Sequence, residues 1–424
     1  ALENVLDEQL QIWEAQSGAQ YQAMSLGQRF EQLLSSASAG SGRKCVVLID
    51  EYDKPLLEAV EDPVLEEHNK NVFKSFFSVL KKEDSHIHFV FITGVTKFSK
   101  VSIFSDLNQL NDISLDEDFA GICGITEAEL TGCFAQEISA LAKSQDLSPK
   151  ECLAELRRAY DGYHFHPKGT GVYNPFSLLK AFYSKEFGSY WFETGTPTFL
   201  VRRLRAAGYD IRKFTSHTLY ASEAMLSDFR ADNPDLTPLL YQTGYLTIVD
   251  FDRVTREYTL AYPNEEVKYG FLENLLPEYA GNCGAGSGKD IFTLRRYIER
   301  GELDNMKDVF IALFAGIPYT TDAPPFEHYF QTVIYLVFTL LGKFSLCEMH
   351  TFKGRIDCVL EAANYVYIFE FKRDDTAENA LKQINESEYA LPYAADLRQI
   401  IKIGVSFDSE SRILKEWKAV RNDV

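Results

Sequence analysis

The sequence lacks a C-x-x-C pair and a long apolar run, and its basic residues are outnumbered by acids. Its seven cysteines are odd in number and scattered, which suits neither a disulfide framework nor a zinc ribbon and predicts a reducing, cytoplasmic location. The longest apolar stretch, 332–341, is far shorter than the roughly 20 residues that cross a bilayer, so we expect no membrane role. Lys and Arg total 43 against 62 Asp and Glu, and the net charge of −19 repels phosphate backbones except where basic residues cluster.

The chain of 424 residues is long enough for two or three domains, and its patterns predict an α/β multidomain protein. The first domain, expected at 1–120, alternates helical and strand patterns, which is typical of a parallel sheet covered by helices. Apolar runs at 45–49 and 87–92 predict two strands buried on both faces. Polar residues follow both strands, and the carboxyl edge of such a sheet is where open α/β folds bind ligands.

Two further regions are expected. Residues 121–290 form a helical middle region, in which 245–249 and 257–260 predict a hairpin and hence a winged-helix-like module. The Gly-rich segment 281–288 predicts a linker. Residues 291–424 form the third region, whose core at 326–407 is predicted as a helix at 326–341, strands at 344–350, 354–361 and 365–372, a helix at 376–394 and a strand at 399–407.

The strongest chemical signal is Gly354-Arg355-Ile356-Asp357, followed at hairpin distance by Glu370 and Lys372. Glu370 and Lys372 are two residues apart on one strand, so both side chains project from the same face, and the hairpin can bring Asp357 beside them. Two carboxylates suit Mg²⁺ or Mn²⁺, and an adjacent ammonium can position a water for attack on a phosphodiester. An isolated E-x-K would be read as a surface ion pair, but the nearly all-apolar strand around it favours a metal-type site.

These residues resemble the PD-(D/E)XK nuclease superfamily, whose core has the same order of helix, three strands, helix and strand as restriction endonucleases. The resemblance implies that Asp357 and Glu370 hold the metal and that Asp357, Glu370 and Lys372 are catalytic. It also implies three supporting residues, namely Glu327 on the first helix and Gln383 and Tyr389 after the E-x-K strand.

A second signal is the apolar strand 46–49 ending in Asp50 and Glu51, which has the form of a Walker B motif. In P-loop ATPases such an Asp holds Mg²⁺ and the Glu polarises the attacking water, although ordinary strand-to-loop transitions also end this way. Thr96 and Lys97 follow the next strand, where a sensor would contact a γ-phosphate.

The chain contains no Walker A loop. Segment 283–290 carries Cys283 where the first Gly is required and Asp290 in place of Ser or Thr, and no strand precedes it. We therefore expect ATP with Mg²⁺ to bind only when an upstream P-loop is present.

The whole chain resembles the AAA-ATPase-like proteins that carry a C-terminal PD-(D/E)XK domain. The segments that match are 48–55, 91–98, 160–163, 263–267 and 354–372. The resemblance implies that 1–120 is a P-loop ATPase-like domain truncated at its N-terminus, through which the protein can oligomerise.

The sequence thus predicts a Mg²⁺-dependent nuclease, gated by the nucleotide state of the ATPase-like domain, with DNA favoured over RNA as its partner. Two alternatives stay open. The nuclease-like fold can be retained in a non-catalytic regulatory or scaffold protein, or it can be the passive partner of a nucleotide-driven switch.

Overall fold

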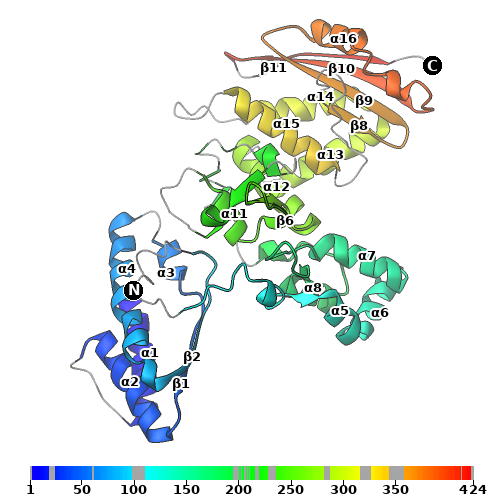
Figure 1. Ribbon diagram of the computed structural model, residues 1–424. Coiled ribbons are helices and arrows are strands. Elements are labelled where there is room, and N and C mark those ends of the chain that lie inside the picture. The colour runs from blue at the N-terminus through cyan, green and yellow to red at the C-terminus, as the bar shows by residue number, and fades with distance from the viewer. Residues whose placement is uncertain are drawn as a thin grey trace. The chain divides into compact units, whose positions relative to one another are not determined.

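The computed structural model (Figure 1) divides the chain into two compact units. Unit 1 comprises Ala1–Thr131, Gly162–Tyr173 and His217–Pro263, and unit 2 comprises Gly132–Asp161, Asn174–Ser216 and Asn264–Val424. The structure describes residues 2–18, 24–59, 62–97, 110–193, 200–201, 203–204, 207, 209, 211–214, 219–227, 235–280, 287–315, 326–342, 358–411 and 413–421. Across these residues, no helix is long and apolar enough to cross a membrane. The domain boundaries at 120 and 290 stay predictions.

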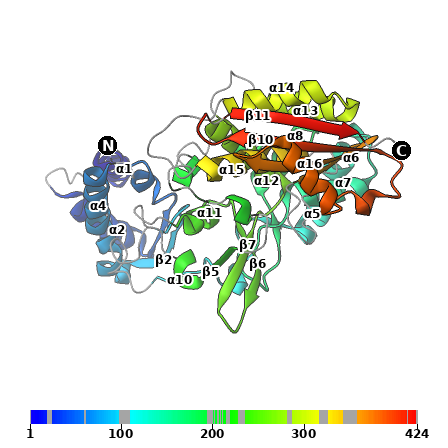
Figure 2. The same ribbon diagram turned by 90° about the horizontal axis from the view of Figure 1, so that it is seen from above.

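The N-terminal part of unit 1 is a parallel pair of strands packed with helices. Its elements are α1 (Leu2–Ser17), α2 (Leu26–Ser41), β1 (Cys45–Ile49), α3 (Lys54–Leu57), α4 (Pro63–Lys82) and β2 (Ile87–Ile92). β1 and β2 pair in parallel, as the sequence predicts, and α2 packs against both α1 and α4 (Figures 1 and 2). A capping box precedes helix α2. The Ser25 hydroxyl accepts from the backbone N–H of Gln28, and the backbone N–H of Ser25 donates to the side-chain carbonyl of Gln28.

A buried ion pair fastens α1 to α2. The Arg29 guanidinium donates to both carboxylate oxygens of Glu14 at 2.7 and 3.0 Å, and it also contacts Asp7. Arg29 and Glu14 are each 4% exposed. Such a pair is held in place because either charge alone would be costly to bury.

The prediction that both strands are buried on both faces is wrong. Val46, Leu48 and Phe89 are 56%, 70% and 51% exposed, and their neighbours on β1 are partly covered. A continuous apolar run reports hydrophobicity, but burial also requires something packed over each face. Within the described part of unit 1, one face of the pair is not covered.

The rest of unit 1 is dominated by a three-stranded antiparallel sheet in the order β5-β7-β6. Strands β6 (Thr247–Asp252) and β7 (Glu257–Ala261) form the predicted hairpin, in which Ile248 pairs with Leu260. Strand β5 (Leu219–Ser222) was not predicted and pairs with β7. Helix α10 (Glu223–Leu226) contacts β5 and α11 (Thr237–Gln242). Unit 1 also contains the antiparallel pair of β3 (Ile125–Thr126) and β4 (Val172–Tyr173) and most of α5 (Glu127–Cys133).

Unit 2 contains helices and the C-terminal sheet. The helices before the sheet are α6 (Ala135–Ser144), α7 (Pro149–Tyr160), α8 (Pro175–Ser184), α12 (Glu265–Ala280), α13 (Ser287–Arg300), α14 (Leu303–Ala315) and α15 (Phe326–Gly342). The sheet has the order β11-β10-β9-β8. Its elements are β8 (Cys358–Glu361), β9 (Tyr365–Arg373), α16 (Ala377–Glu386), β10 (Gln399–Asp408) and β11 (Ile413–Arg421).

The described part of this region follows the predicted order with two corrections. The helix predicted at 376–394 ends at Glu386, because Ser387 caps it, Glu388 has a positive φ, and Pro392 lies in a separate 3₁₀ turn. Strand β11 was not predicted and pairs antiparallel with β10. The strand predicted at 344–350 lies outside the described residues.

Candidate functional site

The alternation of side chains along β9 gives the C-terminal sheet two different faces. Tyr367 and Phe369 point toward the long helices, where the Tyr367 hydroxyl donates to the Ile298 carbonyl and Phe369 packs on Phe310 and Phe338. Figure 1 shows these helices on one side of the sheet and α16 on the other. The residues that alternate with Tyr367 and Phe369 along β9 therefore point to the other face of the sheet, toward α16.

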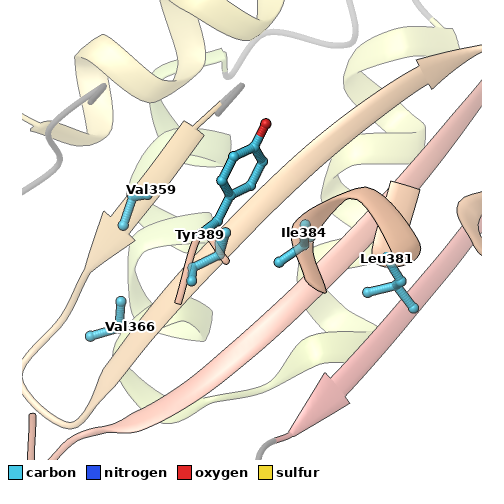
Figure 3. Packing of buried hydrophobic residues seen from close by; sticks show 6 residues of the cluster. Val359, Val366, Leu381, Ile384 and Tyr389 are labelled. Atoms are coloured by element: carbon cyan, nitrogen blue, oxygen red, sulfur yellow. The ribbon is translucent and has the colours of Figure 1, made fainter. Parts of the chain in front are cut away.

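A hydrophobic cluster joins α16 to that face. It contains Val359 from β8, Val366 and Ile368 from β9, Leu381 and Ile384 from α16, and Tyr389, all 5% exposed or less (Figure 3). Glu370 and Lys372 continue the row that Val366 and Ile368 begin, so they also lie on the α16 face. The sequence prediction that Glu370 and Lys372 share a face is confirmed by this register.

Glu370, Lys372, Gln383 and Tyr389 form one connected polar group. The Lys372 ammonium donates to Glu370 Oε1 at 3.0 Å and to the side-chain carbonyl of Gln383. The Gln383 amide donates in turn to the Tyr389 hydroxyl at 3.3 Å. Glu370 is 2% exposed, whereas the Lys372 side chain keeps 23% of its surface. The buried carboxylate is thus paired with a cation that still reaches solvent.

Close packing of α16 on β10 brings Gln383 to Lys372. Thr376 caps the N-terminus of α16, and its hydroxyl accepts from the backbone amide of Asn379 at 3.2 Å. Its first turn lies against Gly404, where an added Cβ would come within 2.2 Å of the Ala377 carbonyl oxygen. Gly404 is the register partner of Glu370. A glycine at this point of β10 therefore sets how near the helix lies to the site.

Two predicted members of this site are not described. Asp357 lies outside the described residues, immediately before β8, whose first residue Cys358 pairs with Phe369. Glu327 lies in the first turn of α15, but its side chain is outside the described part. The described β8–β9 ladder ends at the pair of Cys358 and Phe369, which are next to Asp357 and Glu370 in the sequence.

Glu370 and Lys372 are residue types that also occur at divalent-cation sites, and only part of the predicted site lies among the described residues. Carboxylate oxygens are the ligands that Mg²⁺ and Mn²⁺ prefer, and Glu370 supplies one carboxylate beside a cation that can contact a phosphate. Among the described residues, no three His, Cys, Asp or Glu side chains gather closely enough to hold a metal. The second carboxylate that the sequence predicts for such an ion, Asp357, lies outside the described residues.

The far end of the β8–β9 hairpin is held by a separate charged cluster. Arg398 donates to Glu361 at 2.7 Å and to Asp396, and it also reaches the Ala362 carbonyl at 3.3 Å. Hydrogen bonding to Arg398 lowers the pKa of Asp396 to about 2. This cluster fixes the turn of the hairpin that carries Glu370.

The Walker-B-like residues of unit 1 meet the end of β2. The Thr93 hydroxyl donates to Asp50, and the Glu51 amide donates to the Thr93 hydroxyl at 3.3 Å. Glu51 has a φ of 50°, and its side chain is 59% exposed and 3.6 Å from the Lys54 ammonium. Asp50 and Glu51 therefore lie at the carboxyl edge of the parallel pair.

The other two predicted nucleotide-site residues are engaged within the protein. Thr96 is 1% exposed, and its amide and hydroxyl donate to Asp53 at 2.5 and 2.6 Å. The Lys97 ammonium lies 3.0 Å from both carboxylate oxygens of Asp112. Asp53 is fully buried and also accepts from the Val95 amide at 3.0 Å. Sequence reasoning did not assign Asp53, although a third acid two residues after the Asp-Glu pair was a visible signal.

Comparison with known proteins gives matches at both ends of the chain. A family described as "Predicted AAA-ATPase" matches residues 1–104, and the PD-(D/E)XK nuclease superfamily matches residues 325–417. A protein of Azotobacter chroococcum mcd 1, described as an uncharacterized protein in the vnfD 5' region, is 37% identical over 394 residues. That alignment covers 91% of this chain and 73% of the relative. No solved structure matches.

Proposed function

Because the chain belongs to the family of AAA-ATPase-like proteins with a C-terminal PD-(D/E)XK nuclease superfamily domain, we propose that it is a metal-dependent nuclease that cleaves DNA. The superfamily domain suggests nuclease activity and a nucleic-acid substrate. The observation that carries the proposal is the Lys372 ammonium, held between Glu370 and Gln383 on the α16 face of the sheet.

The second carboxylate of the proposed site is Asp357. Successive pairs of the described β8–β9 ladder are Val359 with Ile368 and Cys358 with Phe369, and in the sequence Asp357 is next to Cys358 as Glu370 is next to Phe369. In this proposal Asp357 and Glu370 hold a Mg²⁺ or Mn²⁺ ion, which when bound would polarise the scissile phosphate.

Lys372 has two roles in this proposal. Two of its three N–H groups donate to Glu370 and Gln383, which fixes the position of the ammonium. Within the described part of the chain these are the two groups to which the ammonium donates, and because its side chain keeps 23% of its surface, we infer that a substrate oxygen can accept from the third N–H. A fixed cation there can orient the attacking water and stabilise the charge that develops on the phosphate. In this chain of net charge −19, such a local cation also offers the phosphate a favourable contact.

Gln383 and Tyr389 support Lys372 in this proposal. The Gln383 amide donates to Tyr389, which leaves its carbonyl oxygen facing the ammonium. Tyr389 is itself 4% exposed and packed in the hydrophobic cluster of α16. This arrangement keeps Lys372 from rotating away from the substrate.

The N-terminal domain supplies control in this proposal. We infer that the nucleotide state of the ATPase-like domain gates cleavage, because the two domains occur in one chain. Equal cleavage with and without ATP by a protein that binds ATP would exclude this gating.

The experiment that tests the nuclease proposal measures cleavage of single- and double-stranded DNA and RNA with Mg²⁺ or Mn²⁺. Lys372→Ala should abolish cleavage. Lys382→Ala is the matched control, because Lys382 lies exposed on α16 and pairs with Glu386 at 3.7 Å. A Lys372→Ala variant that cleaves as well as the parent and Lys382→Ala would refute the role of Lys372. Preferred cleavage of RNA would refute the choice of DNA.

A further inference from the structure

In unit 1, Gln242 joins the loop after β2 to the elements around the three-stranded sheet. Gln242 is the last residue of α11, five residues before β6 begins. Its side-chain carbonyl accepts from the Lys97 amide at 2.8 Å, and its side-chain NH₂ donates to the Leu226 carbonyl at 2.8 Å. Leu226 ends α10, which directly follows β5. One side chain therefore bonds segments that lie 145 and 16 residues away in the sequence.

The loop that Gln242 contacts is held at its other end by the Walker-B-like strand. Thr93 donates to Asp50, while Asp53 fixes the amides of Val95 and Thr96. The Tyr52 hydroxyl donates to the Thr96 carbonyl at 3.0 Å. The segment that starts at Asp50 is thus bonded to the loop at several successive residues.

The loop has little room to adjust by local rearrangement. An added Cβ at Gly94 would come within 2.6 Å of the Tyr52 ring and 2.7 Å of the Asp53 carboxylate. Asp53 and Thr96 are 0% and 1% exposed. Displacement at Asp50 or Thr93 is therefore expected to move the loop as a body.

We propose that residues 93–97 act as a relay, which passes the state of the Asp50–Thr93 contact through Gln242 to α10 and to the β5-β7-β6 sheet. A ligand that takes the Asp50 carboxylate from Thr93 would shift the loop, and Gln242 would carry that shift to α10 and α11. The proposal does not depend on the nuclease activity. It assigns Gln242, which the sequence did not single out, as the connecting residue.

Hydrogen exchange of the full chain tests the relay from both ends. Thr96→Val keeps the shape of the side chain but removes its bond to Asp53, and Gln242→Met removes both bonds of the amide at similar length. Each variant is expected to speed exchange about fivefold in peptides covering 93–97 and also in those covering 223–227, as the loss of a single hydrogen bond predicts. Because Gln242 bonds both segments directly, faster exchange of 223–227 in Thr96→Val is the result that requires coupling between them.

Two controls separate coupling from general loosening. Thr131→Val removes the bond from the exposed Thr131 hydroxyl to the Glu127 carbonyl of α5, and it should leave both segments unchanged. Peptides of α16 in unit 2 should exchange as in the unchanged protein. Faster exchange confined to the mutated segment, or spread over every peptide, would overturn the proposal.

Discussion

Replacement of Lys372 by methionine removes the cation that pairs with a buried carboxylate. Glu370 is 2% exposed and lies 3.0 Å from the Lys372 ammonium. Removing one partner of a fully buried ion pair costs about 3–5 kcal/mol, because the other charge is left uncompensated. The Lys372 side chain keeps 23% of its surface, and solvent screening there reduces the expected loss to about 2 kcal/mol.

The assay for this loss is hydrogen exchange of the amides in β9 and α16. A loss of about 2 kcal/mol in local stability makes these amides exchange roughly 30-fold faster. Lys382→Met is the matched control, since Lys382 and Glu386 are 68% and 67% exposed and such a helix pair contributes about 0.3–0.5 kcal/mol. If Lys372→Met exchanged no faster than Lys382→Met, the buried pair would not stabilise the site as reasoned here.

Three further predictions concern the scaffold. Arg29→Met leaves Glu14 buried without its partner and should lower the free energy of unfolding of unit 1 by about 3–5 kcal/mol in urea. Lys82→Met, which breaks the ion pair between the exposed Lys82 and Glu31, should have a much smaller effect. Gly404→Ala forces α16 away from β10 and should cost about 1–3 kcal/mol and reduce cleavage, while a variant as stable and active as the parent would show that the helix is not held there. Because Arg398 lowers the pKa of Asp396 from 3.8 to about 2, the stabilisation from Asp396 is complete above about pH 4 and is lost as the pH falls toward 2. Asp396→Asn should flatten this part of an acid-unfolding curve, and an unchanged curve would contradict the assignment.

The parts of the fold that follow local rules were predictable from the sequence. The strand period of two placed Glu370 and Lys372 on one face, and hydrophobic runs located β1, β2 and the β6–β7 hairpin. The family resemblance implied Gln383 as a supporting residue on the helix after the E-x-K strand, and the structure brings its side chain to Lys372.

What the sequence did not reveal depends on contacts between distant segments. Asp53 binds residues 42 and 43 positions further along the chain, and Gln242 binds a residue 145 positions before it. No local pattern marks such partners, because they are chosen by the packing of the folded chain. The exposure of Leu48 has the same origin, since whether a strand face is buried depends on what lies over it.

The most direct test of the central claim is cleavage of DNA with and without a divalent cation by the parent protein, Asp357→Asn and Glu370→Gln. We predict that the parent cleaves DNA with Mg²⁺ or Mn²⁺, that EDTA stops cleavage, and that both variants are inactive while their circular dichroism spectra match the parent. Cleavage that persists in EDTA or in either variant, or a parent inactive with both metals, would contradict the account.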